Sequence, residues 1–268
     1  RSEEAFQLAK EHDEMSVYAT ALGDEGSTTE YSAIARFYES KNEQGRAGQF
    51  YSKCGQYMKA LNLYLDCGER EMDRAIDVVG KARSDMLTHT LIDYLMGEWD
   101  GEPKDPNYIY RLYVALGNYE RASATAVLIS KQERELGNYK VSHYQLYTTM
   151  AEMTNQGVRV PSDLRNAFLL LHSYVLVKKL VKMGKHVNAA LMLRRVVESL
   201  SEFPQHTVMI LTTAVIESYR SGMKKKAFEY ASTLMRAEYR GDIPEKYKKK
   251  IESIVRKHKS TVEDPEEE

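Results

Sequence analysis

The sequence predicts an all-α fold: an α-solenoid of stacked antiparallel helical hairpins, tetratricopeptide-like but irregular in period. The first observation is a recurring phrase in which a glycine is followed five residues later by an alanine. The second is a composition rich in helix-favouring residues, with only 6 Pro and 15 Gly in 268 residues. The third is the lack of any β-hairpin signal beside the helical pattern. One hairpin alone cannot bury its apolar face, so neighbouring hairpins are expected to stack.

The recurring phrase is most complete around Gly55, where it matches two halves of the tetratricopeptide pattern. Gly48 and Tyr51 supply the upstream half, and Ala60 and Tyr64 supply the downstream half. Small residues let two helices approach closely, and the aromatic ring fills the gap beside them. A glycine between the helices suits a turn that needs positive φ. The residues predicted to carry repeat packing are Gly48, Tyr51, Gly55, Tyr57, Ala60, Tyr64, Gly117, Ala122, Gly184, Ala189, Gly222 and Ala227.

The other copies of the phrase begin at Gly117, Gly184 and Gly222, and they are less complete. Two of the intervals between the glycines suit about two units of ~34 residues, but the period drifts and the proline near the end of each unit is missing. A further Gly-Asn-Tyr at Gly137 has Ser142 in the alanine position. The copies therefore predict helical hairpins more strongly than regular tetratricopeptide repeats.

A first set of hairpins is expected over residues 1–96. Thr28 or Thr29 is expected to cap the third helix, because a Gly-rich turn precedes it. The expected helices are 2–12, 13–22, 31–40, 46–53, 57–66, 70–83 and 84–96. Residues 97–106 contain two Gly and two Pro, so they are expected to form a loop.

A second set of hairpins is expected over residues 107–260, continuous with the first. Ser162 or Asp163 is expected to cap the longest helix, and Pro204 to open a later one. The expected helices are 107–116, 119–135, 139–155, 162–183, 186–203, 204–220, 224–236 and 244–257. Residues 261–268 form an acidic tail that is expected to be disordered. The chain starts without a signal peptide, just ahead of a helix, which suggests a fragment of a longer protein.

Composition excludes several functional classes. With 43% hydrophobic and 29% charged residues, the chain has enough apolar side chains for a substantial core. The formal net charge of -1 provides no bulk field toward nucleic acid. No apolar run is long enough for a transmembrane segment. Cys54 and Cys67 form no Cys-x-x-Cys pair, which favours a reduced, intracellular setting.

No motif for catalysis or cofactor binding occurs in the sequence. Phosphate-binding loops, dinucleotide fingerprints and zinc-protease motifs are all absent. The seven histidines are scattered, and those in helices are interpreted as packed or surface residues. The prediction is therefore a protein that is not an enzyme, with no catalytic, cofactor-binding or metal-ligating residues and no cofactor.

Candidate partner-binding residues are few. The 19 tyrosines are interpreted mainly as core filling, with a Tyr-lined peptide groove as the alternative. Trp99 lies in a polar loop, where it either packs back on the helices or anchors a partner. A basic cluster is interpreted first as a solvated helix face and second as a site for an acidic protein or an anionic membrane. This cluster comprises Lys246, Lys248, Lys249 and Lys250.

The C-terminal third contains strings that go beyond generic repeats. They are residues 204–217, 234–236, 238–240 and 246–252. In these strings the chain resembles the tetratricopeptide region of the WD-repeat and tetratricopeptide subunits of intraflagellar transport complex A. The resemblance covers most of the chain and is densest after Pro161.

The resemblance implies a protein-interaction scaffold at the cilium or flagellum and the ciliary base, on the cytoplasmic side. It implies retrograde transport and import of membrane proteins into the cilium. The implied partners are other complex A subunits and membrane-protein cargo adaptors, with no nucleic acid. The family's N-terminal β-propellers and C-terminal zinc-binding segment are not in this chain. The family supplies no catalytic residues to carry over.

Three other functions use the same architecture. A vesicle-coat or tethering solenoid is the first alternative. A peptide-binding tetratricopeptide adaptor is the second, although the basic clamp that it needs cannot be assembled from the sequence. A nucleic-acid adaptor is the weakest, because the charge balance is neutral.

Overall fold

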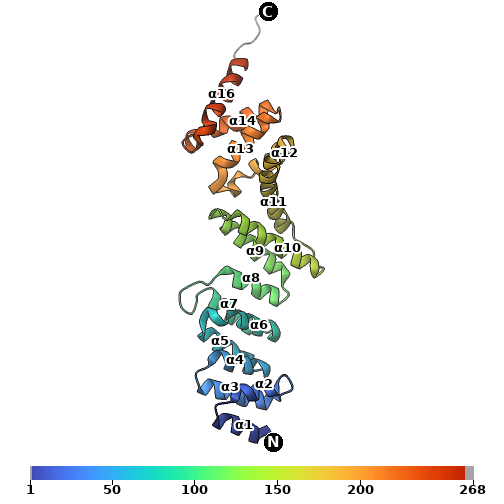
Figure 1. Ribbon diagram of the computed structural model, residues 1–268, viewed down its shortest axis with the longest axis vertical. Coiled ribbons are helices and arrows are strands. Elements are labelled where there is room, and N and C mark those ends of the chain that lie inside the picture. Colours follow the sequence, from blue (N-terminus) through green and yellow to red (C-terminus); the bar gives the residue numbers. More distant parts are fainter. Residues whose placement is uncertain (1, 263–268) are drawn as a thin grey trace, which may run out of the picture. The chain divides into compact units, whose positions relative to one another are not determined.

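The computed structural model describes residues 2–262, and in that range it contains 16 α-helices, three short 3-10 turns and no strand (Figure 1). The predicted all-α class is therefore confirmed. The chain divides into two compact units, Arg1–Thr125 and Ala126–Glu268, and the boundary falls inside one helix, α9. Within each unit most helices pack on the next helix along the chain, as in an α-solenoid.

The first unit is a succession of short helices. Its helices are α1 (Ser2–Glu11), α2 (Met15–Leu22), α3 (Thr28–Ser40), α4 (Gln44–Lys53), α5 (Tyr57–Asp66), α6 (Met72–Ala82), α7 (Asp85–Leu95) and α8 (Pro106–Ala115). A 3-10 turn, Gly68–Glu71, joins α5 to α6. Helix α3 packs on α4, α4 on α5, α5 on α6, and α6 on both α7 and α8.

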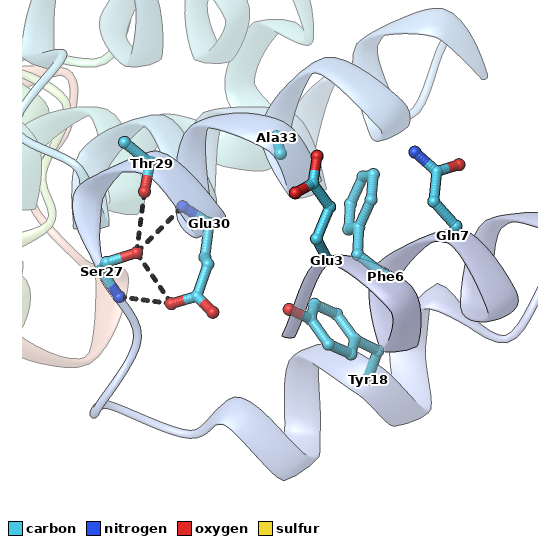
Figure 2. A pocket seen from close by; sticks show the side chains of 8 residues that line it. All are labelled: Glu3, Phe6, Gln7, Tyr18, Ser27, Thr29, Glu30 and Ala33. Atoms are coloured by element: carbon cyan, nitrogen blue, oxygen red, sulfur yellow. Dashed lines mark hydrogen bonds between the residues drawn. The ribbon is translucent and has the colours of Figure 1, made fainter. Parts of the chain in front are cut away.

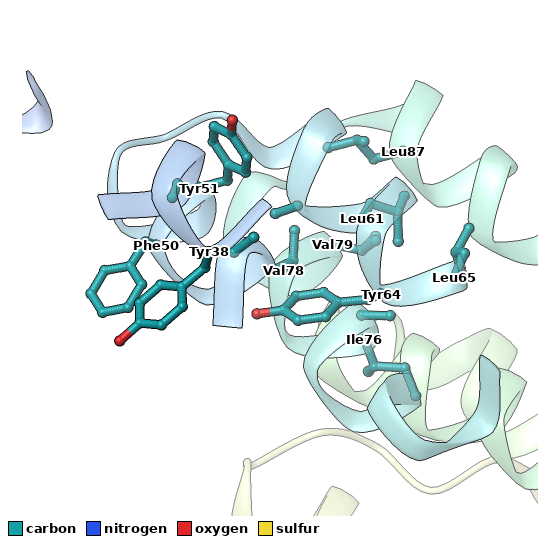
Figure 3. Close-up of a cluster of buried hydrophobic side chains, with 14 of the residues drawn as sticks. Tyr38, Phe50, Tyr51, Leu61, Tyr64, Leu65, Ile76, Val78, Val79 and Leu87 are labelled. Carbon is teal, nitrogen blue, oxygen red and sulfur yellow. The ribbon is translucent and has the colours of Figure 1, made fainter. Parts of the chain in front are cut away.

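Aromatic rings fill the core of the first unit (Figure 3). Tyr38 on α3 stacks on Phe50 of α4, with ring centroids 5.7 Å apart. The Tyr51 hydroxyl donates a hydrogen bond to Glu39 at 2.6 Å, so this buried ring keeps its polar end satisfied. Aliphatic residues of α5, α6 and α7, such as Leu61, complete the cluster.

The second unit begins within α9 (Tyr119–Glu135). It continues with α10 (Tyr139–Asn155), α11 (Ser162–Lys182), α12 (His186–Val197), α13 (Thr207–Arg220), α14 (Lys224–Leu234), α15 (Ala237–Arg240) and α16 (Glu245–Val262). Helices α10 to α14 pack in sequence order, and α16 packs on α14. No helix in the part of the chain that the structure describes is both long and apolar enough to cross a membrane.

Two helix starts differ from the sequence prediction. The cap of α3 is Ser27 rather than Thr28 or Thr29. Its hydroxyl accepts from the Glu30 backbone N–H, and the Glu30 carboxylate accepts from the Ser27 backbone N–H. This capping box satisfies two backbone donors reciprocally, which a threonine one residue later cannot do. Helix α11 begins at Ser162 after Pro161 and has no side-chain cap.

The helix expected over 186–203 ends early, at Val197. Two 3-10 turns follow, Leu200–Glu202 and Pro204–His206. Phe203 lies between the turns with φ −132° and ψ 52°, outside the α region that the following proline disfavours, and its side chain is fully buried. Helix α13 consequently starts at Thr207 rather than at Pro204.

The end of the chain is described only in part. Helix α16 continues past the expected end at residue 257 to Val262. The acidic tail predicted over 261–268 thus overlaps the last two residues of this helix. Its remaining residues lie outside the part that the structure describes.

Candidate protein-interaction surfaces

Each glycine of the recurring phrase occupies the same turn. Gly55, Gly117, Gly184 and Gly222 all have φ between 69° and 81°. No atom lies within 4 Å of a Cβ placed at any of these four glycines. The residue after each glycine donates its N–H to the carbonyl five positions earlier, as Gln56 does to Tyr51 at 2.9 Å. This is the Schellman pattern, so the backbone conformation requires glycine here and tight packing does not.

The alanine of each copy lies in a helix interface. Ala60, Ala122, Ala189 and Ala227 are each at most 1% exposed. Gly48 differs from the turn glycines, because a Cβ there would lie 2.8 Å from the Tyr64 ring. The ring of Tyr64 is itself buried, and Tyr57 is half-buried at the start of α5.

The same turn occurs at two glycines outside the four copies of the recurring phrase. Gly137 and Gly157 have φ of 84° and 68°, and the residues after them make the same backbone hydrogen bond. In the Gly137 copy, the alanine position is taken by buried Ser142. The Ser142 hydroxyl donates to the Ser130 carbonyl at 2.9 Å, and the two serine hydroxyls lie 2.6 Å apart. Serine thus replaces alanine at this buried position with its hydroxyl group hydrogen-bonded.

Trp99 packs back on a helix and also faces solvent. Its ring meets Tyr94 edge-on at 5.7 Å, while 54% of the residue remains exposed. The loop around it is held by Lys104, which pairs with Asp100 at 2.5 Å and donates its backbone N–H to Leu95. The loop thus presents a large apolar side chain from a fixed position, which suits an anchor for a partner.

The predicted basic cluster on α16 is only partly one face. A step of 100° per residue places Lys246, Lys249 and Lys250 within an arc of about 100°, and Lys248 about 100° farther round the helix. Lys248 pairs with Glu245 at 3.2 Å, and Lys250 lies over the ring of Tyr219 on α13 at 5.3 Å. Lys246 lies over the ring of its neighbour Tyr247. The arrangement favours local interactions over a shared ligand.

Exposed apolar side chains gather on α10, where the sequence predicted no partner-binding residue. Tyr144 and Tyr147 are 67% and 54% exposed, and Val141 is 55% exposed. These residues are three apart, so they follow one face of α10. The buried stripe of the same helix contains Ser142, Leu146, Thr149 and Met153. Their position off that stripe is the signal that would have identified them.

The pocket at the first helices is built around a helix cap (Figure 2). Phe6 of α1 meets Tyr18 of α2 edge-on at 5.8 Å and forms its apolar wall. The Glu30 carboxylate belongs to the capping box with Ser27. This carboxylate therefore caps helix α3, and Glu3 of α1 supplies the second carboxylate that lines the pocket.

The titratable groups of the second unit join helices to each other. Glu217 on α13 is 1% exposed and accepts hydrogen bonds from His186 at 2.5 Å and Arg220 at 3.1 Å. His143 and His172 are stacked with ring nitrogens 3.1 Å apart. Burial, and secondarily the charge of His172, lowers the pKa of His143. Within residues 2–262, no cluster of three or more His, Cys, Asp or Glu side chains is placed to hold a metal ion.

Comparison with known proteins shows that the chain matches one segment of longer proteins. No family model matches. The chain is 46% identical over 259 residues to WD repeat-containing protein 19 of mouse and of human, which covers 95% of the chain. This chain is a homologue of one segment of WD repeat-containing protein 19. It is also 36% identical over 257 residues to WD repeat-containing protein dyf-2 of Caenorhabditis elegans.

The similarity to WD repeat-containing protein 19 confirms the resemblance based on the strings after Pro204. The chain spans 19% of the length of the two mammalian relatives and 18% of dyf-2. The aligned segment includes nearly all of the helices described above, since it covers 95% of the chain. The activities and partners of the whole WD repeat-containing protein 19 therefore do not transfer directly to this segment.

Proposed function

We propose that this chain is a protein–protein interaction scaffold within intraflagellar transport complex A. In this role it supports retrograde ciliary transport and the import of membrane proteins into the cilium. The carrying observation is the 46% identity to WD repeat-containing protein 19 over 95% of the chain. The stacked helices, without any recognised catalytic motif in the sequence, support a role in assembly rather than in chemistry.

The exposed apolar face of α10 is the proposed contact for another complex A subunit. Burying a large apolar side chain contributes about 1.5–3 kcal/mol, so Tyr144 and Tyr147 together can change affinity by more than a hundredfold. Both rings are more than half exposed in this chain. Aromatic anchors surrounded by polar residues are typical of binding hot spots. The proposed interface therefore centres on these two tyrosines.

A pull-down of the 268-residue chain with the other core subunits of complex A tests the proposal. The wild-type chain should retain at least one subunit, and the Tyr144→Ser/Tyr147→Ser variant should retain much less. Met86→Ser/Met96→Ser is the matched control, because these side chains are also more than half exposed but lie in the first unit. Failure of the folded wild-type chain to retain any complex A subunit would refute the proposal.

A vesicle-coat or tethering solenoid remains the second candidate, because it uses the same stacked helices. Location in the cell separates the two. A fluorescently tagged full-length protein should concentrate at the ciliary base and along the cilium, on the cytoplasmic side. Concentration on Golgi membranes would favour the coat or tether instead.

A further inference from the structure

A groove in the second unit combines an apolar floor with a cationic rim. Helices α10, α11, α12 and α13 line it, and its volume is about 560 Å³. Its floor contains Val177, Leu193 and Ile210, each at most 2% exposed, and Met209 forms a more exposed wall. A groove of this size falls within the range of about 300–1,000 Å³ that is usual for ligand sites.

Four lysines line this groove from two adjacent helices. They are Lys140 on α10 and Lys178, Lys179 and Lys182 on α11. No aspartate or glutamate is among the described residues that line it. Burial lowers the pKa of Lys178, and the nearby charge of Lys140 lowers it further. The rim therefore concentrates positive charge, and no acidic residue of the lining neutralises it. An anionic partner would reduce the repulsion between the lysine side chains.

The apolar floor selects among anionic partners. Nucleic acids bind through phosphate contacts and through bases stacked on exposed aromatic faces. The ring of Tyr174 is only 3% exposed and already carries Lys178 over its face at 4.6 Å, so it offers no stacking platform. A membrane surface is broad and does not insert into a concave groove between helices. An acidic peptide with apolar side chains complements both the floor and the rim.

We propose that the lysine-rimmed groove binds an acidic amphipathic helical segment of a partner protein. Leucine or phenylalanine at i, i+3, i+4 and i+7 would contact the less buried apolar lining residues Val175, Val181 and Met209. Carboxylates flanking that stripe would pair with Lys140 and Lys178. The inference rests on the proposed scaffold role and adds to it the chemistry of one partner. The groove shares α10 with the exposed tyrosines, because Lys140 lies four residues before Tyr144. Lys178 on α11 and Met209 on α13 belong to other helices, so they alter the groove without changing the tyrosine-bearing helix.

Fluorescence anisotropy with a labelled synthetic peptide tests this inference. The probe is a peptide of about 14 residues with leucine and phenylalanine at i, i+3, i+4 and i+7 and glutamate elsewhere. Saturable binding that weakens with added salt is expected. A peptide with lysine in place of every glutamate, and a scrambled acidic peptide, should both bind at least about tenfold more weakly.

Variants of the chain locate the binding. Lys140→Glu/Lys178→Glu should weaken binding of the acidic peptide at least about tenfold. Lys131→Glu/Lys225→Glu changes the net charge equally at exposed positions of the same unit, and should have less than about a twofold effect. Met209→Glu should weaken binding through the apolar wall, and circular dichroism checks that each variant is folded. Equal losses in the two lysine variants would overturn the inference, as would equal binding of the glutamate and lysine peptides.

The complex A pull-down separates this inference from the scaffold role. Retention of a complex A subunit without peptide binding refutes the groove alone. Peptide binding that depends on Lys140 and Lys178, without retention of any subunit, refutes the complex A role and leaves the groove standing. Displacement of the bound peptide by single-stranded RNA would instead assign the rim to nucleic acid. If the wild-type chain sediments with vesicles that contain phosphatidylserine and Lys140→Glu/Lys178→Glu does not, the rim would be assigned to a membrane.

Discussion

Gly48→Ala should destabilise the chain, although alanine is the better helix former. Replacing glycine by alanine inside a helix contributes about 0.8–1 kcal/mol of stability. At position 48, however, the new Cβ would lie 2.8 Å from Cε1, 3.0 Å from Cζ and 3.1 Å from Cδ1 of Tyr64. Tyr64 is only 2% exposed, so its ring has little room to withdraw. Overpacking costs about 1–3 kcal/mol, so the net change should be a loss of up to about 2 kcal/mol.

A double-mutant cycle with Tyr64 isolates the steric origin of that loss. In a Tyr64→Leu background the ring is gone, and Gly48→Ala should become stabilising by up to about 1 kcal/mol. Gly45→Ala in the same helix is the matched control. The three atoms nearest to its Cβ would all belong to the side chain of Glu71, whose carboxylate at 2.9 Å can move. This control should be neutral or slightly stabilising in both backgrounds.

Guanidinium unfolding followed by far-ultraviolet circular dichroism measures all six chains. The reasoning fails if Gly48→Ala stabilises the wild-type chain as much as it stabilises the Tyr64→Leu chain. That result would mean that Tyr64 makes no close contact with position 48.

Three further predictions concern burial and capping. Burial raises the pKa of both Tyr51 and Tyr64 to about 12, so the folded chain holds protons that the unfolded chain loses near pH 10. Stability should therefore be unaffected below pH 10 and fall as the pH rises from about 10 to 12, in unfolding curves measured across that range. Ser142→Ala should cost about 1–3 kcal/mol by leaving the buried Ser130 hydroxyl without its partner, and adding Ser130→Ala should recover part of this loss in thermal unfolding. Ser27→Ala should cost about 1 kcal/mol by removing the cap of α3, and Ser27→Asp should retain most of the stability.

Local backbone requirements explain what the sequence predicted well. A glycine at the end of a helix with positive φ is required by the turn itself, so Gly55 and Gly184 indicate their turns without knowledge of the fold. Glycine and proline also interrupt the chain after α7, and the next helix begins at Pro106. The early end of α12 was not predicted. It depends on Phe203 entering the core, which is a tertiary contact without a local sequence signal.

The candidate surfaces were the least predictable feature for the same reason. Lys140 and Lys178 belong to different helices, and their shared groove exists only because α10 packs on α11. Tyr144 and Leu146 are two apart in one helix, yet the first is 67% exposed and the second is fully buried. The recurring glycine and alanine fix how the helices turn and pack, and they do so equally in every copy. Specificity for a partner must therefore reside in residues that the repeat leaves free to vary, on faces such as the one that Tyr144 and Tyr147 share.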